Sequence, residues 1–441
     1  MDQQPDTPDA TDDVTTAPGE ANAAPGEANA ALDAAWDRFV AHVADSANVI
    51  REDPRAEDPQ IRAQGYKYLV NLTNAALEQQ VFSADTRFPE HGHLQDSTKR
   101  YATESPDCLF GVSSVDPQGT YVIRATGGNP HYTGLTLYRD MDMYGAVQGA
   151  PPENYRQIFA AATGSTLGAL AHPGGLTIDA DGGWEVLVAA TRPEDWDGDF
   201  LPLSADVNHV ITRQYFYDWE REQAHHVSIE RLDGPAGGPV DTPDHVTERL
   251  VGAGEQVEGM ALFWRLLYNI KAKAKYNVLV TEPALAENYA GGSGGLIAYG
   301  GGFLEIQQDE AAIVEFTPPE CHFWNFHLGD LWSQSLDYTW RQTHLNGHQA
   351  TLDDEGVFRG VVSHVDPGVA NWFDTAGNTR VHVTYRWWLM PHDQDVQPTV
   401  RIVKLADLDA ELHPSTPRTT PAARAEALRV RRDAVLRRYQ R

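Results

Sequence analysis

Cysteine and positive charge are both scarce in this sequence. Cys108 and Cys321 are the only cysteines among 441 residues. A disulfide framework is therefore excluded, and a metal site built from thiolates is not expected. The 34 lysines and arginines face 63 aspartates and glutamates, which gives a formal net charge of −29. Contacts to nucleic-acid phosphates need a basic surface, so we expect no nucleic-acid partner.

Long hydrophobic runs are also missing. No apolar run approaches the length of a membrane span, and residues 1–13 lack the basic and apolar regions of a signal peptide. We therefore expect a cytoplasmic protein with no membrane span. Apart from the glycine-rich GGSGG at residues 291–295, which is typical of a linker, the sequence contains no GxSxG, no P-loop and no GxGxxG before a helix. We predict no cofactor.

The length favours two domains with tails, because 441 residues exceed one ordinary core. A change from helical to strand periodicity and a Gly/Pro-rich stretch after residue 232 indicate the boundaries. The predicted segments are a disordered acidic tail (1–30), a helical N-terminal segment (31–104), a first β-sandwich lobe (105–232), a linker with a helix (233–290), a second β-sandwich lobe (291–405) and a basic C-terminal helix and tail (406–441).

Helical patterns flank the β regions. A second helix is expected to begin at Asp58-Pro59, an N-cap followed by proline in the first turn. A third begins at Pro243, and a basic amphipathic one at Thr420-Pro421. We expect the basic helix to dock on the chain's own acidic surface, with a membrane or an acidic partner as the alternatives. The apolar stripe predicted for the first helix is Leu32, Trp36, Phe39, Val40 and Val43.

Short β-rich runs begin near Cys108 and are separated by turn signals. One of these runs is Gly175–Ala180, GLTIDA. The pattern predicts a mainly β protein with helical flanks, in which two antiparallel β-sandwich, jelly-roll-like lobes are joined by a helical linker. The stretch from Cys321 to Trp388 is the densest in aromatic, turn and polar residues, and we expect the functional site there.

Polar residues of that stretch are the candidates for a site. Residues 335–341 alternate as in a strand, which places Asp337 and Arg341 on one face, where they orient a ligand or form a salt bridge. Trp372 is a candidate stacking platform for a polyol, although the aspartates beside it also fit turn caps. The catalytic candidates are Asp337, Asp366 and Asp374, and the ligand-binding candidates are Arg341, Asn346, Gln349, Asn371 and Trp372.

Histidine spacing does not favour a metal site. Asn346-Gly347 is a strong hairpin-turn dipeptide, and a hairpin here would point His344 and His348 to opposite faces. The helical i, i+4 spacing of a zinc pair therefore does not apply. We predict no metal ligands, while a composite site that joins several His and Asp residues stays open.

Several motifs together resemble one family. They are GYKYL (Gly65–Leu69), RQYFYDWE, LGDLWSQSLDY, LNGHQA, DPGVANWFDTAG and RWW. They resemble the bacterial family catalogued as domain of unknown function 1214, over residues 32–403 and most specifically over 328–377. The resemblance implies jelly-roll-like β-sandwich character in the C-terminal region and implies no reaction.

Three functions are consistent with these observations. The first is binding, or slow transformation, of a polar small organic molecule, polyol- or carbohydrate-like, in a cleft of the second lobe. The alternative is a non-catalytic protein-interaction module. The sequence also leaves open whether the chain forms a homo-oligomer. The second alternative is a metal-dependent hydrolase or oxygenase with a composite His/Asp site. The sequence leaves open whether the protein is an enzyme.

Overall fold

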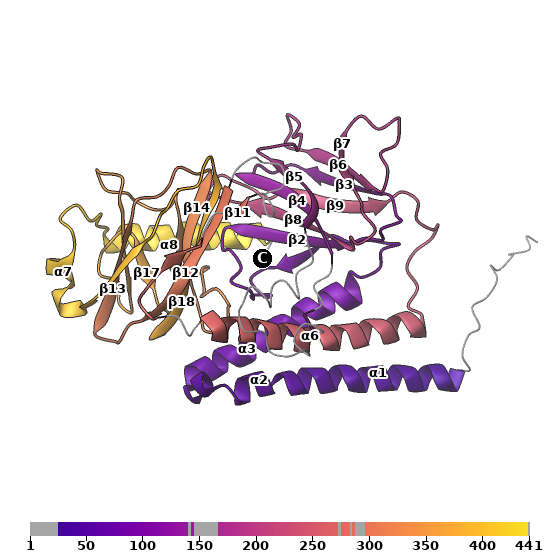
Figure 1. Cartoon of the computed structure of the whole chain (residues 1–441), viewed down its shortest axis with the longest axis horizontal. Helices are drawn as coiled ribbons and strands as arrows, with labels where there is room; N and C mark the ends of the chain where they lie inside the picture. The colour runs from indigo at the N-terminus through magenta and orange to yellow at the C-terminus, as the bar shows by residue number, and fades with distance from the viewer. Residues whose placement is uncertain are drawn as a thin grey trace, which may run out of the picture.

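The computed structural model describes residues 25–139, 143–144, 166–271, 275–282, 285–286 and 296–439. Within these residues the strands form four sheets, two in each of two lobes that lie side by side above a layer of helices (Figure 1). The prediction of a mainly β fold with helical flanks is confirmed. No helix of the described residues is long and apolar enough to cross a membrane.

The helical layer contains α1 (Pro25–Ser46), α3 (Pro59–Ala76) and α6 (Pro243–Lys271). Helix α3 begins where predicted, because the Asp58 carboxylate accepts hydrogen bonds from the backbone N–H of Gln60 and Ile61. Residues 25–30 are helical, which corrects their assignment to the disordered tail; residues 1–24 lie outside the described residues. Short elements connect the layer: α2 (Asn48–Arg51), η1 (Pro54–Glu57) and the π-helix η2 (Leu77–Phe82).

The apolar stripe predicted for the first helix is only partly buried. Phe39 packs inward, whereas Trp36 is 55% exposed and Val40 is 45% exposed. Helix α1 packs mainly along α6. A single partner helix covers a narrower face than a sheet would, so the outer half of the stripe faces solvent.

The first lobe is a sandwich of two sheets. Strands β6 (Trp184–Ala189) and β7 (Asp199–Pro202) pair in parallel, and the other pairs are antiparallel. The run Gly175–Ala180 is not a strand, which corrects the prediction. It belongs to the connection between β5 (Thr166–His172) and β6. One sheet has the order β1 (Gly92–Gln95), β2 (Cys108–Ser114), β8 (His209–Tyr215), β4 (Tyr132–Tyr138), β5 (Thr166–His172), and the other has β7 (Asp199–Pro202), β6 (Trp184–Ala189), β3 (Tyr121–Thr126), β9 (His226–Arg231).

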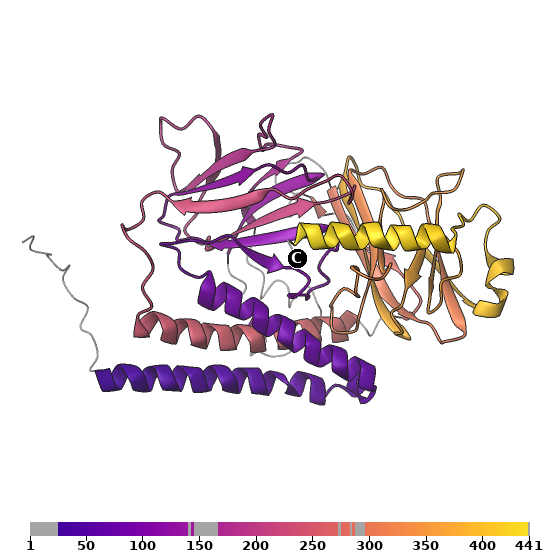
Figure 2. The ribbon, with the colours of Figure 1, turned by 180° about the vertical axis from the view of Figure 1, so that it is seen from behind.

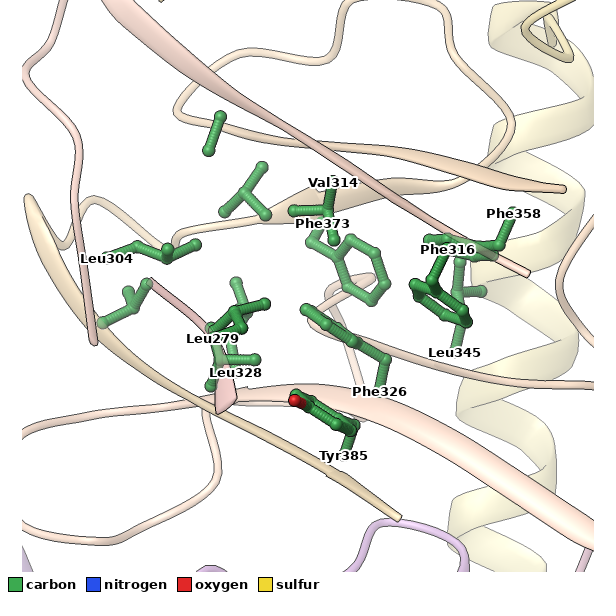
Figure 3. Packing of buried hydrophobic residues seen from close by; sticks show 14 of the residues in the cluster. Leu279, Leu304, Val314, Phe316, Phe326, Leu328, Leu345, Phe358, Phe373 and Tyr385 are labelled. Carbon is green, nitrogen blue, oxygen red and sulfur yellow. The ribbon is translucent and has the colours of Figure 1, made fainter. Parts of the chain in front are cut away.

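The second lobe is also a sandwich of two sheets. Its core is aromatic: Figure 3 shows Phe316, Phe326 and Phe373 gathered between the sheets, and the rings of Phe326 and Phe373 are 5.0 Å apart. One sheet has the order β10 (Val280–Thr281), β12 (Leu296–Glu305), β18 (Arg380–Met390), β14 (Phe323–Gly329), β15 (His344–Asn346), with β11 (Leu285–Ala286) also on β12; the other has β17 (Trp372–Asp374), β16 (Phe358–Ser363), β13 (Glu310–Phe316), β19 (Thr399–Lys404).

The two lobes share one topology. The order β2-β8-β4-β5 corresponds to β12-β18-β14-β15, and β7-β6-β3-β9 corresponds to β17-β16-β13-β19. In both lobes one sheet ends in a parallel pair, β6–β7 or β16–β17. The register assigns equivalent positions: the pair Tyr132–Tyr215 of the first lobe corresponds to Phe323–Trp388 of the second.

A turn motif repeats with the topology. The sequences TIDADGGW (177–184) and TLDDEGVF (351–358) precede or begin equivalent strands β6 and β16. In the first, the Asp179 carboxylate accepts from the backbone N–H of residues 181 and 183. In the second, Asp353 accepts in the same way from residues 355 and 357. The glycines of both turns, Gly182 and Gly356, have positive φ. The lobes are therefore two versions of one structural unit.

The C-terminal helix α8 (Pro421–Arg438) joins the lobes. Figure 2 shows it running from the second lobe toward the first, on the side away from the viewer of Figure 1. It follows η3 (Leu405–Asp407) and α7 (Leu408–Glu411). The helix docks on the chain itself, as expected, and buries Ala434 and Val435. Its buried face carries Arg424, Arg431 and Arg438, spaced by seven residues.

Candidate functional site

The candidates Asp337, Arg341 and Asp374 bind groups of the protein itself. Residues 335–341 form turns rather than the predicted strand. The Asp337 carboxylate accepts from the backbone N–H of Thr339 at 2.8 Å and of Trp340 at 2.9 Å. Asp337 therefore caps its own turn and does not pair with Arg341, which instead donates to Asp374 at 2.7 Å.

Asp366 and Trp372 meet at a guanidinium of α8. Arg424 donates to the Asp366 carboxylate at 2.9 Å, and its guanidinium carbon lies 5.4 Å from the centre of the Trp372 ring. It also donates to the backbone carbonyl of Ala370 at 3.2 Å. The Trp372 ring is thus a stacking platform, but the group that stacks on it is the Arg424 guanidinium of the same chain.

Asn346, Gln349 and Asn371 hold loops. The side-chain carbonyl oxygen of Asn346 accepts hydrogen bonds from the backbone N–H of His348 and Gln349, both at 3.0 Å, and closes a turn. Strand β15 pairs with β14, and the described residues after Asn346 form no second hairpin strand, so the hairpin prediction was wrong. The Gln349 carbonyl accepts from Asn346 N–H at 3.2 Å, and Asn371 donates to the carbonyl of Thr351 at 2.7 Å.

The structure therefore pairs Arg341 with Asp374, brings Asp366 and Trp372 to the same guanidinium of Arg424, and joins Asn346 to Gln349 in one turn. None of them lines the groove described below. These side chains satisfy backbone groups, which is the common use of Asp and Asn in loops.

A buried polar cluster lies where the lobes meet, around Asp107. This carboxylate is fully buried and accepts from His344 Nε2 at 2.5 Å and from Asn346 Nδ2 at 2.7 Å. It also accepts from Trp219 Nε1 at 2.9 Å and Asn325 Nδ2 at 2.7 Å. Burial alone would raise the pKa of Asp107, but His344 and the amide donors outweigh it and hold that pKa below its usual value.

The tautomer of His344 follows from its neighbours. Arg431 lies 3.3 Å from His344 Nδ1, and a guanidinium can only donate. Nδ1 therefore accepts, and Nε2 carries the hydrogen that Asp107 receives. Burial lowers the pKa of His344, which agrees with a neutral ring. The Asp–His pair resembles part of a hydrolase triad, but both ring nitrogens are engaged and both residues are sealed from solvent, so the cluster positions the lobes.

The groove of interest lies in the first lobe and has a volume of about 430 Å³. It is lined by the loop before β4, the end of β5 and the Asp179 turn, with His225 beside them. Two glycines allow the loops to meet closely: a Cβ on Gly182 would lie 2.5 Å from the carbonyl oxygen of Gly128. The lining residues are Gly128, Asn129, Pro130, His172, Ile178, Asp179, Ala180, Asp181, Gly182 and His225.

His225 is the buried residue of this lining. Its Nδ1 donates to the carbonyl of Gly127, since a carbonyl only accepts, and its Nε2 accepts from the Thr133 hydroxyl at 3.1 Å. Burial lowers the pKa of His225, so the ring is neutral near pH 7. Its backbone N–H donates to the Gln214 side chain at 2.7 Å.

Other polar groups of the groove are available to a ligand. The Asn129 carbonyl accepts from Gln223 N–H at 2.8 Å, which leaves its amide N–H₂ without a partner among the described residues. The His172 ring and the Asp181 carboxylate also make no hydrogen bond or ion pair within the part of the chain that the structure describes. The groove thus offers donors and acceptors that the described residues do not engage.

The second lobe carries aromatic rings at the positions that surround His225 in the first. These are Phe316, Trp324 and Trp387, whose rings pack at centroid distances of 5.3 to 6.1 Å. The register places Ala125, Thr133 and Gln214 there in the first lobe. Thr133 and Gln214 form hydrogen bonds with His225 of the groove lining, so polar contacts replace the aromatic packing of the second lobe.

Metal ligation has little support in the described residues, which contain no group of three His, Cys, Asp or Glu side chains able to hold a metal ion. Sequence reasoning missed the groove, because its lining comes from four separate loops and strand ends. The signal that was present is the repeat of TIDADGGW and TLDDEGVF, which pairs the lobes and draws attention to the first turn.

These features define a two-lobed β-sandwich protein with a helical layer. No family model and no curated protein matches the chain. Among solved structures it is similar to an uncharacterized protein from Burkholderia cenocepacia, with 27% identity over 86% of this chain and 99% of that chain and a TM-score of 0.71. The VPA0106 protein from Vibrio parahaemolyticus aligns over 76% of this chain and 98% of its own at 10% identity with a TM-score of 0.38, too low to support an argument.

Proposed function

We propose that this protein binds a small hydroxylated organic compound, polyol- or carbohydrate-like, in the groove of the first lobe. The observation that carries the proposal is the groove of about 430 Å³, whose lining includes Asn129, His172 and Asp181, polar side chains with spare hydrogen-bonding capacity among the described residues. Ligand pockets of small molecules commonly span roughly 300 to 1,000 Å³ and hold a few convergent polar groups. The proposal moves the expected site from the second lobe to the first.

The chemistry of the lining favours this ligand class. Asp179 and Asp181 lie in the groove of a chain with a net charge of −29, which disfavours an anionic ligand. A carboxylate, an amide and an imidazole each form hydrogen bonds with hydroxyl groups. Binding is favoured over catalysis, because the buried His225 has both ring nitrogens engaged by the fold.

Isothermal titration with a panel of monosaccharides and sugar alcohols tests the proposal. We expect one or more panel members to bind one per chain. Asp181→Asn and Asn129→Ala should each weaken the binding about tenfold, by the worth of one or two hydrogen bonds. Glu355→Gln is the matched control, because Glu355 takes the place of Asp181 in the equivalent turn of the second lobe. No binding across the panel, or an equal effect of the control, would contradict the proposal.

A protein-interaction role is the second candidate. It is supported by large exposed apolar side chains on α1, α3 and η2, of which Val70 is 67% exposed and Phe82 is 69% exposed. Trp36, Val40 and Tyr66 add to this set. Native mass spectrometry of the full chain, alone and with Val70→Asp, tests whether this surface forms homo-oligomers.

Three further expectations belong to the proposal. We propose that the chain is related to the family of domain of unknown function 1214, on the motifs quoted above, and that it is cytoplasmic. A metal-dependent hydrolase or oxygenase is less well supported, since the described residues offer no three-ligand cluster. Elemental analysis of protein purified without chelator tests it: a stoichiometric transition metal would favour that reading.

A further inference from the structure

Two histidines form a reciprocal contact where the lobes meet. His131 directly precedes β4 and His322 directly precedes β14, so they hold equivalent positions in the two lobes. Their rings stack with centroids 4.1 Å apart and planes 19° apart. The Nε2 of His131 donates to the carbonyl of His322 at 3.0 Å, and the Nε2 of His322 donates to the carbonyl of His131 at 3.1 Å. Equivalent residues thus contact each other, as in the isologous interface of a two-fold dimer.

The reciprocal hydrogen bonds determine which ring nitrogens of His131 and His322 carry hydrogen. Backbone carbonyls only accept, so both Nε2 atoms carry hydrogen and any further proton must bind at Nδ1. His131 Nδ1 lies 3.6 Å from the Glu222 carboxylate, which stabilises a proton there. Two charged rings stacked at 4.1 Å would repel each other, since like charges at this distance interact strongly when partly buried.

Other ionisable groups surround the pair. The ring of Tyr217 packs on His131 with centroids 4.8 Å apart and planes tilted by 32°. His172, at the end of β5, disfavours charge on His322. Tyr217 also contacts His348, which lies 3.7 Å from Asp218. The Cys321 thiol is next to His322 in the chain, and its raised pKa keeps it neutral.

The two rings differ in proton affinity. Burial opposes charge on His131, but Glu222 outweighs it and raises the pKa of His131 above 6.5. Burial and the neighbouring His131 lower the pKa of His322 below 6.5. The His131 contribution to stability is present below pH 6.5 and is lost as pH rises through its folded pKa. The His322 contribution is present above pH 6.5 and is lost as pH falls below it.

We propose that this pair is a proton-sensitive contact between the lobes, closed when it holds one extra proton and opened by a second. The cluster of buried apolar residues beside it, where Tyr132 and Trp388 meet at 5.8 Å, does not depend on a proton and keeps the lobes together. The opening is therefore local, confined to the segments around residues 128–132 and 320–324.

Hydrogen exchange of the full chain at pH 7.5 and 5.0, corrected for intrinsic rates, tests the proposal. We expect amide exchange in these two segments to accelerate at least tenfold at pH 5.0 relative to the rest of the chain. His322→Gln keeps a side-chain N–H donor but cannot take up a proton, so it should remove the acceleration. His42→Gln is the control, because it removes another His–carboxylate pair, His42–Glu258, in the helical layer. Equal acceleration in His322→Gln, or none in the unmodified chain, would overturn the proposal.

Ring titration by nuclear magnetic resonance keeps the test independent of the stability of the variant. In the unmodified chain, His131 and His322 should titrate on opposite sides of pH 6.5. If both titrate together near 6.5, the proposal fails.

Discussion

Glu104 is a buried carboxyl group that makes the stability of the fold depend on pH. It accepts hydrogen bonds from the hydroxyl and from the backbone N–H of Ser335, and Arg100 lies 3.9 Å away. Burial raises the pKa of Glu104 to about 7, from an ordinary value of 4.5. The folded state therefore holds this proton more tightly than the unfolded state does. Its contribution to stability is full below pH 4.5 and is lost as pH rises toward 7.

Glu104→Gln should flatten this pH dependence. A shift of this size corresponds to at most about 3 kcal/mol of unfolding free energy. Between pH 5 and pH 8, the unmodified chain should lose up to this amount relative to the variant, because the amide stays neutral. Urea unfolding at the two pH values measures it. Glu355→Gln, at an exposed position, serves as the control, and an equal pH dependence in Glu104→Gln would contradict the assignment.

Single residues also show where sequence reasoning succeeded. Asp58 and Thr420 are local caps whose partners lie two or three residues ahead, and both were identified from the sequence. Asp107 was not identified, because its partners Trp219, Asn325 and Asn346 lie 112 to 239 residues away. No local sequence pattern indicates its role, because these partners come together only in the folded chain.

Among the elements, α8 depends on its arginines. Arg431 donates to the carbonyl of His344 at 2.8 Å and stacks on Trp219 at 5.0 Å, fully buried. Arg429, on the same helix, forms exposed ion pairs with Glu426 and Asp433. The buried arginine therefore joins the lobes, while the exposed one has only solvent-screened partners.

Arg431→Lys should destabilise the fold by about 2–3 kcal/mol, because lysine loses the planar stacking and the forked hydrogen bonds. Arg429→Lys should change stability by less than about 0.5 kcal/mol. Urea unfolding compares the two variants, and hydrogen exchange of residues 421–438 localises the effect. Equal stability of the two variants would show that the buried face of α8 is not held by its arginines.

The whole molecule carries a large excess of negative charge. With a net charge of −29, repulsion between surface carboxylates opposes the compact state. Salt screens this repulsion, since the Debye length falls from about 10 Å at 0.1 M to about 3 Å at 1 M.

Raising sodium chloride from 0.05 to 0.5 M should therefore raise the melting temperature by several degrees. Differential scanning calorimetry measures the shift. Choline chloride should give the same increase if screening is the cause, whereas an effect of sodium alone would indicate a specific ion site. A melting temperature that stays constant or falls would show that other charge contacts dominate.

The sequence alone determined the class of the fold and much of its local structure. Caps, periodicity and turn residues act over a few positions, so they predicted the start of α3, the start of α6 and the mainly β character of the chain. These local signals failed where one pattern is compatible with two structures. Polar and apolar side chains alternate over residues 335–341 as in a strand, but the segment forms turns. Asn346-Gly347 belongs to a turn capped by the Asn346 side chain and not to a hairpin.

Only the tertiary structure decided which side chains meet. The burial of Phe39 but not Trp36 depends on the single helix that covers α1. Thr133 and Gln214 bind His225 of the groove lining at positions where the second lobe has aromatic rings. That equivalence appears only in the strand register. Contacts between distant segments depend on the packing of whole elements, which no short stretch of sequence specifies.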